Sequence, residues 1–219
     1  MRVFLVAGLG ADERLFRNLD LSGFEVIPAL WLKPEKADTL TTYATKLIRE
    51  YGIRQGDAVI GVSLGGMLTV EIAKQVKLAH AIIISSIKSK AEAPWYFGFF
   101  RAFPIYRLFT GGFVKKLGPL LRPLFGVFAG SKEAPLFYSM LQNSDPDFLT
   151  WAMYAALGWN GDPAPYPIHQ FIGSKDLIFN AKKAKSATVI PGADHMLVFT
   201  RAAEISPAIR KILNNETTA

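Results

Sequence analysis

The 219-residue sequence contains no cysteine, which excludes disulfide bonds, thiol nucleophiles and cysteine-ligated zinc or iron–sulfur clusters. Histidine is scarce too: the three residues His80, His169 and His195 leave little material for a metal site, so we expect neither a metal nor a cofactor. Long uncharged runs are also missing. The longest stretch without Asp, Glu, Lys or Arg covers residues 148–161, which is shorter than the roughly 18–20 residues that cross a bilayer as a helix.

Acidic residues are nearly absent from one part of the chain. Residues 88–132 contain eight basic residues and a single acid, Glu92, and therefore carry the whole net charge of +7, while the remaining residues include 17 of each sign. The basic character is therefore local. A uniformly basic surface for nucleic acid is not expected, whereas this one region suits an anionic partner.

The N-terminus begins with Met1 and Arg2, followed by the apolar residues 3–9. A single Arg is a weak start for a signal peptide, and the same residues would form a buried strand that ends in a glycine-rich loop. We therefore expect a cytoplasmic protein, with secretion as the alternative.

Apolar runs bounded by Gly, Pro and Asp alternate with amphipathic segments, which is typical of a parallel sheet covered by helices. The expected strands are residues 2–7, 24–30, 58–62, 79–85, 168–173 and 187–191. The expected helices around them are residues 39–51, 66–76 and 199–213. We therefore predict an α/β fold with a mostly parallel sheet of about six strands, flanked by helices.

Residues 88–167 separate the fourth and fifth expected strands, so we divide the chain into a core, 1–87 and 168–219, and a helical cap, 88–167. Prolines cut the first part of this insertion into short pieces, and residues 148–157 predict one further helix. Eleven of the chain's 27 aromatic residues lie within residues 94–128: Trp95, Tyr96, Phe97, Phe99, Phe100, Phe103, Tyr106, Phe109, Phe113, Phe125 and Phe128. We expect the insertion to cover the carboxyl edge of the sheet.

The most specific motif is Gly61-Val62-Ser63-Leu64-Gly65, which matches G-x-S-x-G between a buried strand and a helix. A strand that turns this sharply into a helix holds Ser63 in a strained conformation, with its hydroxyl above the sheet edge. The positions two before and two after Ser63 need glycine, because neighbouring backbone crowds them. The motif favours a nucleophilic serine; the alternative is a glycine-rich turn without chemistry.

A second loop, Ala7-Gly8-Leu9-Gly10, follows the first strand. It can present the backbone N–H of Leu9 toward Ser63, and the N–H of Leu64 lies at the start of the following helix. Two such donors would stabilise the oxyanion of a tetrahedral intermediate.

A serine nucleophile needs a general base, and that base needs an acid to orient it. Asp176 and His195 each follow an expected strand, so both can reach the sheet edge that carries Ser63. Asp194 directly precedes His195, where side chains diverge, and is better suited to a turn or helix cap.

Other candidates for these roles fit less well. Asp145, Asp147 and Asp162 lie in the insertion, and one of them remains an alternative acid. His80 begins a buried strand and is expected to be structural. His169 is at a strand start, the wrong end of the sheet for catalysis.

On these residues the chain resembles the α/β-hydrolase superfamily, specifically the small, lidded serine hydrolases with an esterase- or lipase-like core. The resemblance covers residues 2–86 and 168–213, and it implies Ser63 as nucleophile, Asp176 as acid, His195 as base, and Leu9 and Leu64 as oxyanion donors. Two departures stand out. Many relatives have His-Gly where this chain has Ala7-Gly8, and the first two strands of the full eight-stranded fold are absent.

The resemblance implies a carboxylic ester hydrolase that acts on a small, apolar acyl substrate, without nucleic acid. A thioester, amide or C–C bond as target, or a binding protein that retains the fold, are the alternatives. For the insertion, two interpretations remain. Its aromatic residues either bury against the core, or they line an acyl pocket while the basic residues face an anionic headgroup or membrane surface.

Overall fold

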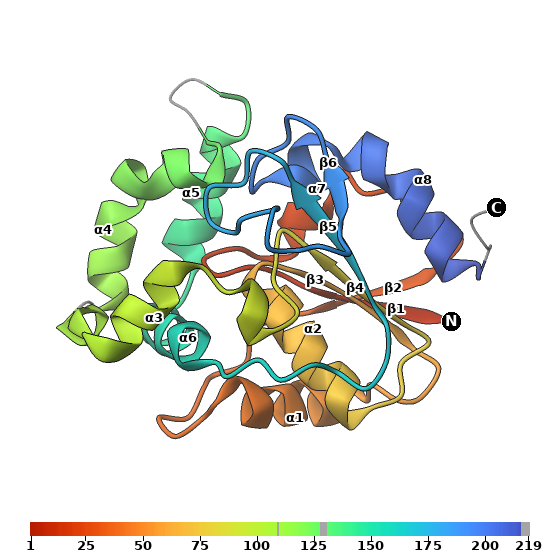
Figure 1. Ribbon diagram of the computed structural model, residues 1–219, viewed down its shortest axis with the longest axis horizontal. Coiled ribbons are helices and arrows are strands. Elements are labelled where there is room, and N and C mark those ends of the chain that lie inside the picture. The colour runs from red at the N-terminus through yellow and green to blue at the C-terminus, as the bar shows by residue number, and fades with distance from the viewer. Residues whose placement is uncertain (109, 128–130, 216–219) are drawn as a thin grey trace.

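The computed structural model describes residues 1–108, 110–127 and 131–215 (Figure 1). Six parallel strands form one sheet in the order β2-β1-β3-β4-β5-β6. Their bounds are β1 Arg2–Val6, β2 Glu25–Ala29, β3 Ala58–Val62, β4 His80–Ile84, β5 Ile168–Gly173 and β6 Thr188–Ile190. The predicted α/β fold and six-stranded parallel sheet are confirmed.

Helices cover both faces of this sheet. In Figure 1, α1 (Leu40–Tyr51) and α2 (Leu64–Gln75) lie below it, and α7 (Leu197–Thr200) and α8 (Ala202–Leu213) lie above it. Every residue of the central strands β3 and β4 is consequently buried, which explains their continuous apolar sequence. Alternate residues of β3 face opposite layers: Ile60 packs toward Ile205 of α8, and Val59 joins Leu68 of α2.

Two predicted helices differ from those in the structure. The helix expected from residue 66 begins at Leu64, directly after Ser63. The single helix expected over residues 199–213 is wrong: α7 and α8 are separated at Arg201, whose φ of −124° and ψ of 24° interrupt the helical backbone. The Arg201 carbonyl then accepts the N–H groups of Glu204 and Ile205 and so starts α8.

The insertion between β4 and β5 is helical. It contains α3 (Trp95–Ala102), α4 (Gly111–Leu121), α5 (Ala134–Asn143) and α6 (Pro146–Gly158), at the left of Figure 1, beside the carboxyl ends of the strands. Short 3-10 helices, η2 (Lys90–Glu92), η3 (Ile105–Leu108) and η4 (Arg122–Phe125), connect them; a further one, η1 (Glu13–Phe16), follows β1. Phe109 and Phe128, two of the aromatics noted in the sequence, lie outside the described residues.

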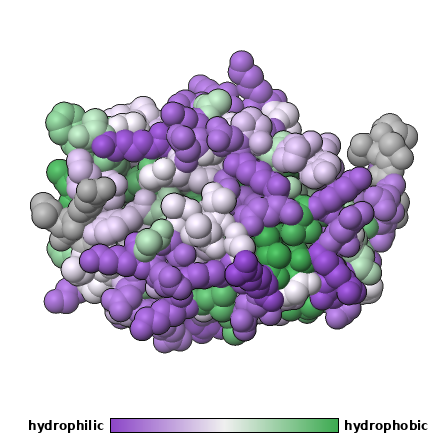
Figure 2. All heavy atoms as spheres, turned by 90° about the horizontal axis from the view of Figure 1, so that it is seen from below, coloured by the Kyte–Doolittle hydropathy of each residue, from purple (hydrophilic) through white to green (hydrophobic). Residues whose placement is uncertain are grey.

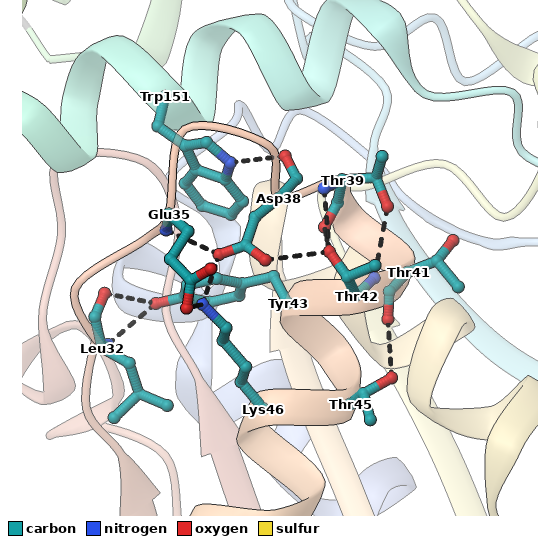
Figure 3. Close-up of polar contacts among 10 residues, drawn as sticks. All are labelled: Leu32, Glu35, Asp38, Thr39, Thr41, Thr42, Tyr43, Thr45, Lys46 and Trp151. Carbon is teal, nitrogen blue, oxygen red and sulfur yellow. Dashed lines mark hydrogen bonds and ion pairs between the residues drawn. The ribbon is translucent and has the colours of Figure 1, made fainter.

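Two tryptophans join the insertion to the core. The indole N–H of Trp151, on α6, donates to the backbone carbonyl of Asp38 at 2.8 Å, and Figure 3 shows this bond above the start of α1. The indole N–H of Trp159, just after α6, donates to the Glu71 carboxylate of α2 at 2.8 Å. Thus one end of the insertion is held by hydrogen bonds as well as by packing.

The outer surface of α1 is hydrophilic. Thr41, Thr42, Arg49 and Glu50 are its exposed residues, and the side of the molecule that carries α1 is largely purple in Figure 2. Within the described ranges, no helix is long and apolar enough to cross a membrane.

Candidate active site

Ser63 occupies the turn between β3 and α2, and its backbone is strained. Its φ of 54° and ψ of −116° lie in a region that residues with a side chain rarely adopt. The Ser63 N–H continues the sheet by donating to the Ile84 carbonyl, while its own carbonyl accepts the N–H groups of Gly66 and Met67. The backbone is therefore held on both sides, and the hydroxyl projects at the carboxyl edge of the sheet.

The two motif glycines are required by close backbone contacts. A Cβ atom at Gly61 would lie 2.1 Å from the Gly65 carbonyl oxygen, and one at Gly65 would lie 2.0 Å from the Val6 carbonyl oxygen. Any side chain at either position would displace backbone. The glycine requirement inferred from the sequence thus has a direct steric cause.

His195 connects Ser63 to Asp176. The Nε2 atom of His195 is 3.1 Å from Ser63 Oγ, and its Nδ1 atom is 2.9 Å from Asp176 Oδ2. Because an ionised carboxylate only accepts hydrogen bonds, Nδ1 carries the proton, and Nε2 is left to accept from the serine hydroxyl. Both His195 and Asp176 are buried, whereas Ser63 is half-buried and reachable from the sheet edge.

The Asp176 carboxylate is itself fixed in place. Its Oδ1 atom accepts the backbone N–H groups of Ile178 and Phe179 at 2.8 and 2.9 Å, which leaves Oδ2 for His195. The Phe179 and Phe125 rings pack on the imidazole, with centroids 5.7 and 5.5 Å away. The imidazole is therefore oriented by hydrogen bonds at its two nitrogens and by aromatic contacts.

Leu9 and Leu64, the expected oxyanion donors, both lie beside Ser63. Leu64 is the first residue of α2, and Leu9 lines the same cavity as Ser63. Gly8, next to Leu9, is so close that a Cβ atom there would be 3.3 Å from Ser63 Cβ. In the part of the chain that the structure describes, neither the Leu9 nor the Leu64 N–H donates to a protein acceptor. Both remain available for a ligand oxygen.

A cavity of about 30 Å³ opens onto Ser63 and His195. Its other walls are mainly apolar, and the side chains Phe125, Phe137 and Met140 of the insertion close it. A water molecule needs about 10–15 Å³ of such space, so the cavity has room for only one or two waters. As it stands, the cavity therefore lacks the space for an acyl chain.

The remaining candidates lie outside the hydrogen-bonded path from Ser63 through His195 to Asp176. Asp194 Oδ1 accepts the N–H of Met196 at 2.9 Å, the turn role predicted for it, and burial raises the pKa of its carboxyl. Asp145 caps α6 by accepting the Asp147 N–H. Asp162 is exposed. The His80 and His169 rings lie 6.2 Å apart at the opposite end of the sheet, and burial lowers the pKa of His80.

The sequence reasoning did not identify Ser86. Its hydroxyl donates to the Ser63 carbonyl at 2.6 Å, and a Cβ atom at Gly66 would lie 2.4 Å from its side chain. Ser86 therefore helps to hold the strained turn. The available signal was its position after β4, which pairs with β3, the strand that precedes Ser63. Among the described residues, no group of three or more His, Asp or Glu could hold a metal ion.

Comparison with protein families gives a match over nearly the whole chain. Residues 2–208 match the model of the alpha/beta hydrolase family. The chain belongs to the alpha/beta hydrolase family. The resemblance inferred from the Ser63, Asp176 and His195 motifs is thereby confirmed at the level of the family. A comparison with curated protein sequences finds no match.

Solved structures share the fold of this family member at low sequence identity. A thermophilic esterase from Thermogutta terrifontis is 18% identical, with a TM-score of 0.74, and the match covers 100% of this chain and 91% of that one. A hydrolase from Oleispira antarctica is 16% identical with a TM-score of 0.74, covering 98% and 91%. A structure from a study of carboxylesterases of Nitrososphaera gargenis is 16% identical with a TM-score of 0.72, covering 99% and 92%.

Proposed function

We propose that this chain is a serine hydrolase that cleaves carboxylic esters by transferring the acyl group first to Ser63 and then to water. The observation that carries the proposal is the continuous path of hydrogen bonds from Ser63 through His195 to Asp176. Nucleophile, base and orienting acid are the three groups that this chemistry requires. The esterases among the structures of similar fold favour an ester over other acyl substrates.

In the first step, His195 Nε2 takes the proton from Ser63 Oγ as that oxygen attacks the substrate carbonyl carbon. The imidazolium that forms is stabilised by the Asp176 carboxylate, 2.9 Å from Nδ1. The carbonyl oxygen becomes an oxyanion, and the free N–H groups of Leu9 and Leu64 donate to it.

The tetrahedral intermediate then collapses. The bond to the leaving alkoxide breaks, and His195 returns the proton to that oxygen. Water, deprotonated by His195, attacks the acyl-enzyme, and a second collapse releases the carboxylic acid and restores the Ser63 hydroxyl.

The walls of the cavity favour an apolar acyl group. Leu15, Val62 and Met140 surround the space next to Ser63, so a hydrocarbon chain would bury there without leaving polar groups unpaired. Because the cavity is small, an acyl chain enters only when Phe125, Phe137 or Met140 moves. We therefore propose the helical insertion as a lid.

A panel of p-nitrophenyl esters, with matched thioesters and amides, tests this function. We expect ester hydrolysis by the wild type and a loss of at least about 10⁴-fold in kcat for Ser63→Ala. The control is Ser89→Ala, because the Ser89 side chain makes no capping bond, and its activity should match that of the wild type. Unchanged ester turnover by Ser63→Ala would refute the mechanism, and hydrolysis of only the amides or thioesters would refute the substrate class.

A further inference from the structure

Helix α3 presents its apolar side to solvent. The exposed residues of this segment are Trp95, Gly98, Phe99, Ala102 and Phe103, and the exposed Pro104 and Ile105 follow them. The only charged residue of α3, Arg101, turns inward, where its guanidinium donates to the Leu157 and Trp159 carbonyls at 2.9 and 2.7 Å. This is the reverse of α1, whose exposed residues are all polar. A helix surface that faces only water is normally polar, so the apolar outer side of α3 suggests a binding partner.

The exposed side chains form one continuous stripe. Trp95 is 78% exposed, Phe99 44% and Phe103 61%. Successive rings are in contact, with centroids 6.5 Å apart for Trp95 and Phe99 and 5.4 Å apart for Phe99 and Phe103. Single exposed apolar residues are ordinary, but contiguous large ones mark an interaction surface. We call Trp95, Phe99, Phe103 and Ile105 the α3 stripe.

Lysines are frequent in the two chain segments that meet at the N-terminal end of the stripe, residues 88–94 before α3 and residues 174–187 after β5. The Lys183 ammonium donates to the Ala93 carbonyl at 2.7 Å, and the Tyr96 hydroxyl donates to the Ile178 carbonyl at 2.6 Å, so the chain after β5 lies against the start of α3. Lys88 also bonds to Ser186. The exposed cations of these two segments are Lys90, Lys175, Lys182, Lys183 and Lys185.

Acidic groups in the same two segments do not offset these cations at the surface. Glu92 and Asp176 are 5% and 9% exposed, and both make internal hydrogen bonds. The nearby exposed acid is Asp162, which follows Gly161, the acceptor of the Lys90 N–H. The surface beside the stripe is therefore strongly cationic.

We propose that the α3 stripe docks on an anionic lipid bilayer, with its aromatic rings at the level of the headgroups and the neighbouring lysines against the lipid phosphates. Tryptophan favours the membrane interface, and apolar side chains combined with lysines bind anionic leaflets. This contact is peripheral and goes beyond the proposed ester hydrolysis.

The charges argue against a second copy of the chain on this surface. Two copies that met through the α3 stripe would bring their lysine clusters near each other, and like charges across an interface oppose association. An anionic bilayer suits both the exposed aromatic rings and the lysines, because its interface accepts apolar rings and its phosphates neutralise the lysines.

The docking helix lies close to the candidate active site. On the inner side of α3, the buried Phe97 packs against Phe179 with centroids 6.4 Å apart, and Phe179 packs against His195. A bilayer bound to the outer side of α3 is therefore separated from His195 by this pair of rings.

Vesicle co-sedimentation tests the proposal separately from catalysis, with the full chain carrying Ser63→Ala so that no turnover is involved. We expect binding to phosphatidylcholine vesicles that contain phosphatidylglycerol, weak binding to phosphatidylcholine alone, and loss of binding at high salt.

Trp95→Ser/Phe99→Ser/Phe103→Ser should lower partitioning at least about tenfold. Lys182→Gln/Lys185→Gln should also lower it by about tenfold or more. Val26→Ser/Leu30→Ser, which changes exposed apolar residues near the opposite edge of the sheet, should have no effect.

Tryptophan fluorescence gives a readout that misfolding of a triple variant cannot imitate. Trp151 and Trp159 are buried and Trp31 is half-buried, so Trp95 is the tryptophan that would enter the bilayer. Anionic vesicles should shift the emission to shorter wavelength. In Trp95→Phe that shift should disappear while co-sedimentation remains.

Three results would overturn the proposal. One is no binding to anionic vesicles at low salt. Another is equal binding of the wild type to neutral and anionic vesicles. The third is that the protein does not bind vesicles but associates with itself, or binds an acidic protein, through the α3 stripe. That result would assign the surface to a protein partner.

Discussion

Two carboxylates lie next to His195, and their surroundings assign them different roles. Asp176 directs Oδ2 to His195 Nδ1 and satisfies Oδ1 with two backbone N–H groups. Asp194 bonds the Met196 N–H and lies against Gly126 of the insertion, where an added Cβ atom would be 2.2 Å from its carboxyl carbon. Only Asp176 can fix the imidazole tautomer, although Asp194 is nearer in sequence.

This difference predicts the behaviour of two matched variants. Asp176→Asn places an amide where the carboxylate accepts the imidazole proton, so kcat for a p-nitrophenyl ester should fall by about 10³-fold or more. Asp194→Asn keeps an oxygen acceptor for the Met196 N–H and should stay within about threefold of the wild type. Steady-state kinetics on the two proteins checks this. Equal losses, or a larger loss for Asp194→Asn, would reassign the acid.

At the scale of elements, the contact between α2 and the segment after α6 depends on a buried ionic group. The Glu71 carboxylate, on α2, accepts hydrogen bonds from Trp159 Nε1, Thr41 Oγ1 and Lys74 Nζ. Two helices of the core, α1 and α2, and the end of the insertion therefore meet at one side chain. A buried carboxylate that loses a donor is costly, since it cannot turn to water instead.

Trp159→Phe removes the indole donor while it keeps most of the ring. The free energy of unfolding should fall by about 2–3 kcal/mol, the cost of a lost bond to a buried charge plus a small cavity. Trp95→Phe makes the same exchange at a residue that is 78% exposed, and its effect should stay within about 0.5 kcal/mol. Urea denaturation of both variants measures the difference. A Trp159→Phe protein as stable as the control would exclude the proposed anchoring role.

The sequence predicted the elements that build the site better than those that cover it. Strand β3 and the Ser63 turn were evident, because glycine spacing and a buried apolar run are local consequences of crowded backbone. The orientation of α3 was not predictable. Aromatic residues occur on both its exposed and its buried sides, so the pattern does not tell which face is buried. The break at Arg201 was equally hidden, since it depends on the backbone of one polar residue.

At the scale of the whole molecule, core and insertion together enclose the candidate active site. Ser63, His195 and the Leu9 loop come from the core, and Phe125, Phe137 and Met140 come from the insertion. The cavity of about 30 Å³ between them is too small for an acyl chain. Chain-length preference should therefore depend on the side chains that the insertion contributes.

Phe137→Ala tests this dependence. Removal of the ring should enlarge the space beside Ser63 and raise kcat/KM for the hexanoate ester relative to the acetate ester by about tenfold. Phe103→Ala makes the same change on the outer surface of the insertion and should leave the ratio unaltered. Kinetics with the two esters decides the matter. An unchanged ratio in Phe137→Ala would place the acyl group elsewhere.

The central claim is that Ser63 is a nucleophile activated by His195, and a fluorophosphonate probe tests it most directly. The probe phosphonylates an activated serine, and peptide mapping by mass spectrometry then locates the adduct. We predict modification of Ser63 in the wild type and its near-complete loss in His195→Ala. An unmodified Ser63 in the folded wild-type protein, or equal modification in His195→Ala, would contradict the account.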